Sequence, residues 1–445
     1  MSKKTENAKD GGLSISAKSF ITAIIVIFVL MILTYGLTFL IPGGGIPFWK
    51  WALSPILVLG AEGNGSLIGV IVFLLVIGGV FNCLDKCGLM KYMLDMITNR
   101  FGKERYKLLA IVTLFFMGMG SFIGSFEEAV PLVPIVVALA IRLGWDALVG
   151  LGMSLLAIGC GFAAGVCNPF TVGVAQELAG LPMFSGMWFR AIGFVVVYAW
   201  LFLFLFLYAK KIEQPLSDEL VNQTFTKDKQ MSCALKYFLG FMGIGIFVVL
   251  SSVVLTFLQD YTMIIVALTF LVAGIIATKS SGRGGNIWKT FLNGVMSVLP
   301  GVIMILMANS IKYTLEEGNI LNTILQGMLE IAKTLPGWSI ILFIYLIVLV
   351  MNFFISSGSA KAFLLMPLIV PLAEPFGISA QLCVMAFAFG DGFSNVFYPT
   401  NPVLLIGIGL AGVDYGKWAK WSWKFQIVNI VLSSALLLVG MAIGY

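Results

Sequence analysis

Long apolar stretches separated by short polar ones follow one another along almost the whole chain. The first, from Phe20 to Pro42, slightly exceeds the roughly 20 residues that a helix needs to cross a bilayer, and no small-residue cleavage site follows it. It therefore predicts a membrane helix and not a signal peptide. The same pattern predicts further continuous helices at 66–84, 188–208, 236–258, 261–278, 290–311 and 425–444.

Two other apolar segments, 108–143 and 338–376, contain polar turns near their middle. The first turn reads Gly-Ser-Phe-Glu-Glu from Gly124, and the second reads Ser-Ser-Gly-Ser-Ala-Lys from Ser356. Each segment predicts a helical hairpin that re-enters the side of the membrane from which it came. Lipid tolerates irregular backbone and charge only where protein or water covers them, so the two turns predict a functional site.

Each predicted hairpin is followed by an apolar segment that contains an Asn-Pro pair. In 147–180 the pair is Asn168-Pro169, and in 380–413 it is Asn401-Pro402. Because proline interrupts a helix, both segments predict membrane helices that are broken in the middle.

One constant shift along the chain, which lays Ser125 on Gly358, superimposes the first of these regions on the second without a gap. The matched positions are mainly Gly, Pro, Asn and Trp, which fix backbone geometry or membrane interfaces, whereas chance similarity of apolar segments would pair Leu, Val and Ala. They are Pro134 with Pro367, Gly144 with Gly377, Gly159 with Gly392, Asn168-Pro169 with Asn401-Pro402, and Trp188 with Trp421. Paired interruptions in two halves are a sequence pointer to the binding site of a transporter.

The distribution of basic residues predicts that the two halves are inverted in the membrane. Segment 85–107 carries six Lys and Arg residues, so it is predicted to be an interfacial helix on the cytoplasmic side. Its counterpart within 312–337 balances Glu with Lys and is predicted to lie in an outer loop. The predicted organisation is a cytoplasmic tail at 1–19, a first inverted repeat at 20–208, a cytoplasmic loop and connector helix at 209–258, and a second inverted repeat at 259–445, with Tyr445 outside.

Composition supports the membrane assignment and excludes several kinds of chemistry. Of the 445 residues, 60% are hydrophobic and only 11% are charged, against about 25% charged residues in soluble domains. The chain has no His, its six Cys show no zinc-site spacing, and it lacks a phosphate-binding GxxxxGK[ST] loop. We therefore expect no metal site, no cofactor, no nucleotide and no nucleic-acid partner, and we expect a transporter, not a membrane enzyme or a channel.

The candidate binding residues lie at the two hairpin turns and the two breaks. Hydroxyls and free amide groups at the start of a half-helix can hold a substrate carboxylate, although Ser and Gly at these positions also simply cap a turn. An Asn beside a helix break can bind both ligand and backbone. The candidate substrate-binding residues are Ser125, Glu127, Glu128, Asn168, Ser357, Gly358, Ser359, Lys361, Asp391 and Asn401, and the candidates for sodium or proton coupling are Gly124, Cys167, Ser356 and Thr400.

Four of these residues are ionisable and are predicted to lie deep in the membrane. Such a charge costs at least about 2.5–3.5 kcal/mol, so each is expected either to pair or to function. Lys361 falls on Glu128 in the repeat, which would bring a base and an acid to opposing turns, and an internal ion pair is the alternative. The three acids Glu127, Glu128 and Asp391 outnumber the one base, which favours a guanidinium or ammonium substrate, or protons.

Four segments of the chain resemble the ion transporter superfamily, and within it the YfcC-like family, which is similar to the anaerobic C4-dicarboxylate carriers. They read SFEEAVPLVPIVVALA, GFAAGVCNPF, SSGSAKAFLLMPL and FGDGFSNVFYPTNP. The resemblance implies a homodimer in the bilayer in which a transport part moves like an elevator against a fixed scaffold. Well-known members hold a carboxylate and sodium with Ser-Asn-Thr at the hairpin tips, and this chain lacks that sequence at both turns.

The sequence thus predicts an all-α polytopic membrane protein with two inverted repeats, each containing a re-entrant hairpin and a broken helix. Since YfcC-like proteins are commonly assigned to basic amino acids, the expected function is exchange or uptake of an arginine or ornithine type of substrate across the bacterial cytoplasmic membrane. A C4-dicarboxylate or another carboxylate, moved with sodium or protons, is the alternative.

Overall fold

The computed structural model describes most of the chain, and the described part is helical without a strand. It covers residues 17–40, 45–61, 65–101, 104–124, 126, 130, 132–215, 227–252 and 262–445. Within these ranges seven helices are long and apolar enough to cross a membrane, so the chain is a multi-pass membrane protein. They lie in α4 (Gly65–Lys86), α6 (Arg105–Gly118) with the π-helical turn that follows it, α11 (Met187–Ile212), α15 (Ile287–Glu317), α17 (Gly337–Phe354), α18 (Gly358–Ala373) with its last turn, and α21 (Tyr415–Ala442).

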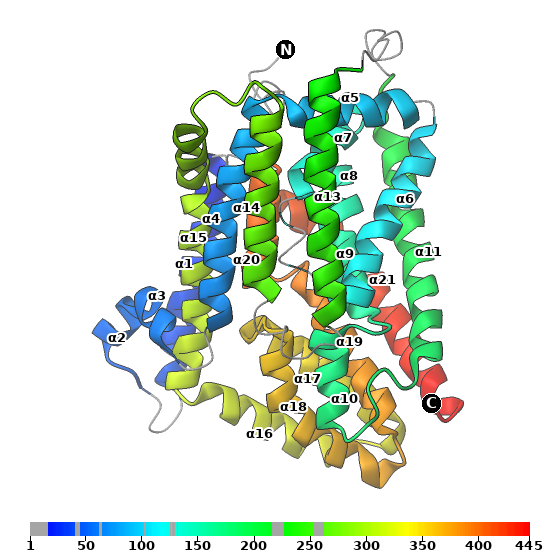
Figure 1. Ribbon diagram of the computed structural model, residues 1–445. Coiled ribbons are helices and arrows are strands. Elements are labelled where there is room, and N and C mark those ends of the chain that lie inside the picture. The colour runs from blue at the N-terminus through cyan, green and yellow to red at the C-terminus, as the bar shows by residue number, and fades with distance from the viewer. Residues whose placement is uncertain are drawn as a thin grey trace.

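One group of long helices packs side by side along one flank of the molecule (Figure 1). In it α13 (Lys229–Ser252) contacts α14 (Thr262–Ser280), α14 contacts α4, α4 contacts α15, and α15 contacts α1 (Ala17–Thr38). Glycines allow the closest approach, because a Cβ on Gly294 would come within 2.2 Å of the Gly78 carbonyl oxygen. Close backbone packing of small residues is typical of helices in lipid.

A second group contains the predicted hairpins and broken helices. Here α17 packs on α19 (Ala380–Asn395), α19 on α9 (Ala157–Ala163), α9 on α6, and α18 on α10 (Val174–Leu178). Helix α20 (Pro402–Leu410) contacts α15 and so joins the two groups. Helix α7 (Val133–Arg142) of the first hairpin and helices α17 and α18 of the second lie at opposite ends of the molecule (Figure 1).

The helices are interrupted inside the ranges where the sequence predicts interruptions. The first broken segment consists of α8 (Ala147–Leu151), a π-helical stretch, α9, a non-helical stretch at 164–168, a second π-helical turn and α10. The second consists of α19, a non-helical stretch at 396–401 and α20. Helices α17 and α18 meet at residues 355–357. The structure thus locates the helix interruptions. The depth of these segments in the membrane and the re-entrant course of the hairpins stay predictions.

Local features recur at positions that the constant sequence shift between the two predicted repeats makes equivalent. Gly144 and Gly377 both have positive φ, +84° and +70°, a conformation that glycine adopts without strain. Two residues further on, Asp146 and Ser379 each cap the next helix. Their side chains accept bonds of 3.1 Å from the amide groups of Val149 and Leu382, which are likewise equivalent under the shift.

Two expectations about element boundaries are wrong. Segment 312–337 is not a loop, because α15 continues to Glu317 and α16 (Ile320–Ala332) follows as an amphipathic helix whose one-sided apolar pattern stabilises it. The connector helix begins at Lys229 and not at residue 236, because the Asp228 carboxylate accepts the amide bonds of Gln230 and Met231 at its start.

Candidate functional site

The centre of the candidate site is a buried ion pair between the second hairpin and the second broken helix. Lys361 Nζ on α18 lies 2.5 Å from Asp391 Oδ1 on α19, and both side chains are 0% exposed. The Lys361 ammonium also donates to the Ile355 carbonyl (3.1 Å) and to Asn352 Oδ1. A fully buried lysine needs such partners, because an unpaired charge has a large desolvation cost.

A chain of amide side chains connects this ion pair to the second break. Asn352 Nδ2 donates to the Ser394 hydroxyl (2.6 Å) and to Asn395 Oδ1 (3.0 Å), and Asn395 Nδ2 contacts Asp391 Oδ1 (3.3 Å). Asn401 Nδ2 then donates to Asn395 Oδ1 at 2.9 Å. Lys361, Asp391 and Asn401, three of the predicted site residues, thus belong to one buried polar network.

The asparagine at each break caps the half-helix that follows it. Asn401 Oδ1 accepts bonds from the amides of Val403 (2.9 Å) and Leu404 (3.3 Å). Asn168 Oδ1 accepts a bond from the amide of Thr171 (3.2 Å). Thr171 follows Asn168 by three residues, which is also the spacing of Leu404 from Asn401. The caps leave both half-helix starts with their positive ends directed toward the breaks.

The second hairpin tip lies against the first break. Gly358 opens α18, and a Cβ on it would come within 2.4 Å of Thr171 Cγ2 and 2.8 Å of Asp391 Oδ2. Only glycine fits so close to both elements. Ser357 is exposed and caps α18 by accepting the Ala360 amide at 3.5 Å, which is the capping role considered for these serines.

Three buried oxygen atoms on residues at this contact or in the second break have no hydrogen-bond partner among the residues that the structure describes. They are Asp391 Oδ2, Thr171 Oγ1 and Thr400 Oγ1. A buried carboxylate oxygen without a donor is costly, so such a group in a native protein calls for an explanation. A ligand that brings hydrogen-bond donors provides one.

The first hairpin tip approaches the first break in a similar way. Gly124 has a φ of +76°, and a Cβ on it would come within 2.1 Å of Asn168 Oδ1. The Cys167 amide donates to the Ser121 carbonyl at 3.3 Å, while the Ser121 hydroxyl donates to Ala164 O (2.7 Å). Ser125, Glu127 and Glu128 lie outside the described residues, so their predicted roles stay predictions.

Sequence reasoning missed one buried cation, Arg190 on α11, which is 2% exposed. Its Nε and Nη2 atoms donate to the Val166 carbonyl of the first break at 3.1 and 3.0 Å, and Nη1 contacts Gln381 Oε1 (3.3 Å) and the Tyr445 hydroxyl (3.2 Å). Burial raises the pKa of the Tyr445 phenol, which therefore stays neutral at physiological pH. The signal that could have identified Arg190 is that it is the single charge in the apolar run 187–209, before the basic end of α11.

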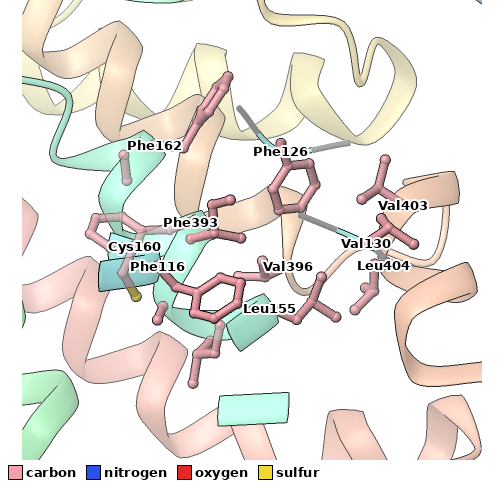
Figure 2. Close-up of a cluster of buried hydrophobic side chains, with 14 of the residues drawn as sticks. Phe116, Phe126, Val130, Leu155, Cys160, Phe162, Phe393, Val396, Val403 and Leu404 are labelled. Atoms are coloured by element: carbon pink, nitrogen blue, oxygen red, sulfur yellow. The ribbon is translucent and has the colours of Figure 1, made fainter. Parts of the chain in front are cut away.

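Apolar side chains surround the crossing of these elements and exclude water from it. Figure 2 shows Phe116, Phe126 and Val130 of the first hairpin against residues of both broken helices. Low dielectric strengthens the polar contacts beside this cluster and makes unpartnered groups there more costly.

The described candidates therefore fall into three sets. Gly358, Lys361, Asp391 and Asn401 lie at the second tip and break, and Gly124 and Asn168 lie at the first tip and break. The two sets meet where Gly358 approaches Thr171. Cys167 and Thr400 lie within the breaks. Ser356, Ser357 and Ser359 lie at the second hairpin tip, and in the described part of the chain their side chains form no hydrogen bond to Lys361 or Asp391.

Comparison with known proteins gives one family and several relatives. A model of the family described as "C4-dicarboxylate anaerobic carrier" (DcuC) matches residues 53–442. A protein of Escherichia coli (strain K12) named "Putative basic amino acid antiporter YfcC" is 30% identical over 404 residues, which are 86% of this chain and 79% of that protein.

Two further matches extend over most of the chain. An "Uncharacterized protein" of Haemophilus influenzae is 27% identical over 397 residues, covering 86% of this chain and 77% of that one. The crystal structure of the Alcanivorax borkumensis YdaH transporter aligns with 95% of this chain and 99% of its own, with a TM-score of 0.49 and 16% identity.

Proposed function

Because the chain belongs to the C4-dicarboxylate anaerobic carrier family (DcuC), it is a membrane transporter, and we propose that it exchanges a basic amino acid of the arginine or ornithine type. The family and the relatives confirm the expectation of a transporter and not an enzyme. They also confirm the resemblance to YfcC-like proteins and anaerobic C4-dicarboxylate carriers.

The observation that carries the choice of substrate is the unpartnered Asp391 Oδ2 beside the second hairpin tip. Lys361 occupies the other carboxylate oxygen, so Oδ2 is an acceptor without a donor among the described residues. Thr171 Oγ1, on a residue that also lies against Gly358, is a second such oxygen. A guanidinium group has five N–H donors and an ammonium group has three, and either would satisfy these acceptors.

The α-carboxylate of the same substrate would bind at a half-helix start. Gly358 begins α18 and Pro402 begins α20, and both starts lie beside the polar network. The positive end of a helix favours an anion at this position. A basic amino acid therefore has a complementary group for each end. The name of the Escherichia coli relative, "Putative basic amino acid antiporter YfcC", supports the same choice.

We propose alternating access by an elevator movement of two inverted repeats, in a homodimer of the bacterial cytoplasmic membrane, with the N-terminus inside and Tyr445 outside. The separation of the described helices into two packed groups, joined by α20 on α15, supports this division into scaffold and transport part. The positive φ angles and helix caps that recur at equivalent positions of the two halves support the repeat. Sodium or proton coupling stays an alternative to exchange.

A C4-dicarboxylate is the second candidate, and the description of the matched family favours it. Among the described buried residues of the site, the cations Lys361 and Arg190 outnumber the anion Asp391. The surplus of acids expected from the sequence therefore depends on Glu127 and Glu128, which lie outside the described residues.

Thermal stabilisation of the purified protein tests the proposal. The panel contains arginine, ornithine, lysine, citrulline, succinate, fumarate and citrate, each with and without sodium. A rise in Tm with the basic amino acids alone is the expected result, since a ligand that binds the folded state stabilises it. Citrulline is the matched control, because it resembles arginine without the positive charge. A rise with succinate or fumarate alone would overturn the basic amino acid in favour of the dicarboxylate.

A further inference from the structure

A cavity of about 270 Å³ lies outside the buried polar network, between the end of α15 and the second hairpin. Figure 1 shows the end of α15 leading into α16, which passes beside α18. On one side the cavity is lined by residues of α15, by the turn after it and by the start of α16. On the other side it is lined by Ile355, which follows α17, and by residues of α18. The lining residues are Lys312, Glu316, Asn319, Leu321, Ile355, Ala360 and Leu364.

Two opposite charges face this cavity from one helix. Lys312 Nζ lies 3.4 Å from Glu316 Oε1, one turn away, and the two side chains are 20% and 44% exposed. A charge-assisted hydrogen bond is about 2.7–2.9 Å long, so this pair is not tightly bonded and both groups have capacity for a ligand. The volume is below the roughly 300–1,000 Å³ of pockets for drug-sized ligands, and therefore suits a single small molecule.

The cavity also contacts the residues that hold the buried lysine. The carbonyl of Ile355 accepts a bond of 3.1 Å from Lys361 Nζ, and Ala360 directly precedes Lys361. A molecule in the cavity would therefore touch the hairpin tip next to the ion pair of Lys361 and Asp391. This position suits a site that a substrate occupies before it reaches the buried network.

We propose that this cavity is an entry site for the zwitterionic head group of an α-amino acid. The ammonium of Lys312 holds the α-carboxylate, and the carboxylate of Glu316 holds the α-ammonium. The inference rests on the proposed amino acid function and adds a second, more exposed binding site to it. A molecule with only one of the two charges would use only one of the two side chains.

Exchange kinetics in proteoliposomes test the entry site, with arginine as substrate and agmatine, which is arginine without its carboxylate, as competitor. Lys312→Gln is expected to raise the KM for arginine about tenfold, to leave the maximal rate unchanged, and to leave the inhibition constant of agmatine unchanged. Glu316→Gln is expected to weaken both molecules, since both carry a cationic group that its carboxylate attracts. Lys312→Arg, which keeps the charge, should retain a KM close to that of the wild type.

Lys50→Gln is the matched control. Lys50 lies 2.5 Å from Glu317, next to Glu316 in sequence, but it does not line the cavity. The hydrogen bond to Glu317 raises the pKa of Lys50, so the control also removes a positive charge. Its KM for arginine is expected to be unchanged.

The outcomes separate the entry site from the proposed function. Arginine exchange that is normal in the wild type and equally normal in Lys312→Gln would overturn the entry site alone. Equal weakening of arginine and agmatine by Lys312→Gln would overturn the carboxylate contact. A wild-type protein that exchanges no amino acid would overturn the proposed function, and the entry site with it.

Discussion

Gly392 and Ala163 lie so close together that a Cβ on Gly392 would come within 2.1 Å of the Ala163 main-chain nitrogen. The same contact recurs with the roles exchanged. Gly159 faces Val396, and the constant sequence shift makes these two residues equivalent to Gly392 and Ala163 respectively. Reciprocal contacts of this kind are what a two-fold axis between equivalent elements produces. The two broken helices thus touch through a reciprocal pair of contacts where α9 crosses α19 and the stretch that follows it.

Gly392→Ala is expected to destabilise the protein, because its added methyl group would meet main-chain atoms that cannot rotate away. Overpacking of this kind costs about 1–3 kcal/mol. Gly159→Ala should cost less, since its methyl group would meet the Val396 side chain. Thermal unfolding in detergent measures both. Gly243→Ala on α13 is the control, because nothing lies within 4 Å of its Cβ position; a Tm in Gly392→Ala equal to that of the control would contradict the prediction.

The Lys361–Asp391 pair predicts a strongly non-additive mutant cycle. Lys361→Met leaves Asp391 buried without its counter-ion, and Asp391→Leu does the converse, so each change is expected to cost about 3–5 kcal/mol. The double variant should be more stable than either single variant, because no unpaired charge remains. Unfolding of the three variants in detergent measures the coupling.

Exposed Lys333, paired with Glu330 at 2.5 Å, provides the comparison for this cycle. Lys333→Met is expected to change stability by no more than about 1 kcal/mol, as for other surface pairs. If the two single variants at Lys361 and Asp391 are as stable as Lys333→Met, the pair does not hold the hairpin to the broken helix.

Asn401→Ala should abolish transport while the protein remains folded in detergent. The change removes the cap of α20, worth about 0.5–2 kcal/mol, and the bond to Asn395 Oδ1. Asn401→Ser retains a capping oxygen and should restore stability but not transport, because it does not reproduce the amide donor. Transport rates and Tm together separate the two roles. Transport at the wild-type rate in Asn401→Ala would remove Asn401 from the site.

Arg190→Lys is expected to be a disruptive change despite the retained charge. Guanidinium presents two nitrogens to the Val166 carbonyl and a third to Gln381 and Tyr445, whereas a lysine ammonium cannot span these acceptors. We expect a lower Tm and a reduced exchange rate. Lys210→Arg, the reverse exchange of lysine and arginine at the basic end of α11, is the control and should behave as the wild type. Full activity of Arg190→Lys would show that the carbonyl needs only a charge.

The sequence determined where the helices run and where they break. Glycine, proline and asparagine act on the backbone within a few residues, so the interruptions at Asn168 and Asn401 follow from local chemistry. Membership of a transporter family can also be recognised from sequence segments alone. The asparagines were predicted as ligands, and their capping bonds follow equally from their position before a half-helix. Two expectations are wrong: the balanced charges of 312–337 favour an outer loop where the structure has α16, and the connector helix is expected from residue 236 where α13 begins at Lys229.

The tertiary structure decided which side chains meet. From the sequence, Lys361 had Glu128 as its aligned counterpart, whereas the structure pairs it with Asp391, 30 residues away on another helix. Likewise, Arg190 binds the carbonyl of Val166, 24 residues earlier in the chain. A buried charge needs a partner in every fold, so the sequence alone indicates that a buried Lys361 must pair with another group. The identity of the partner depends on how helices distant in sequence pack, and that is fixed only when the whole chain is folded.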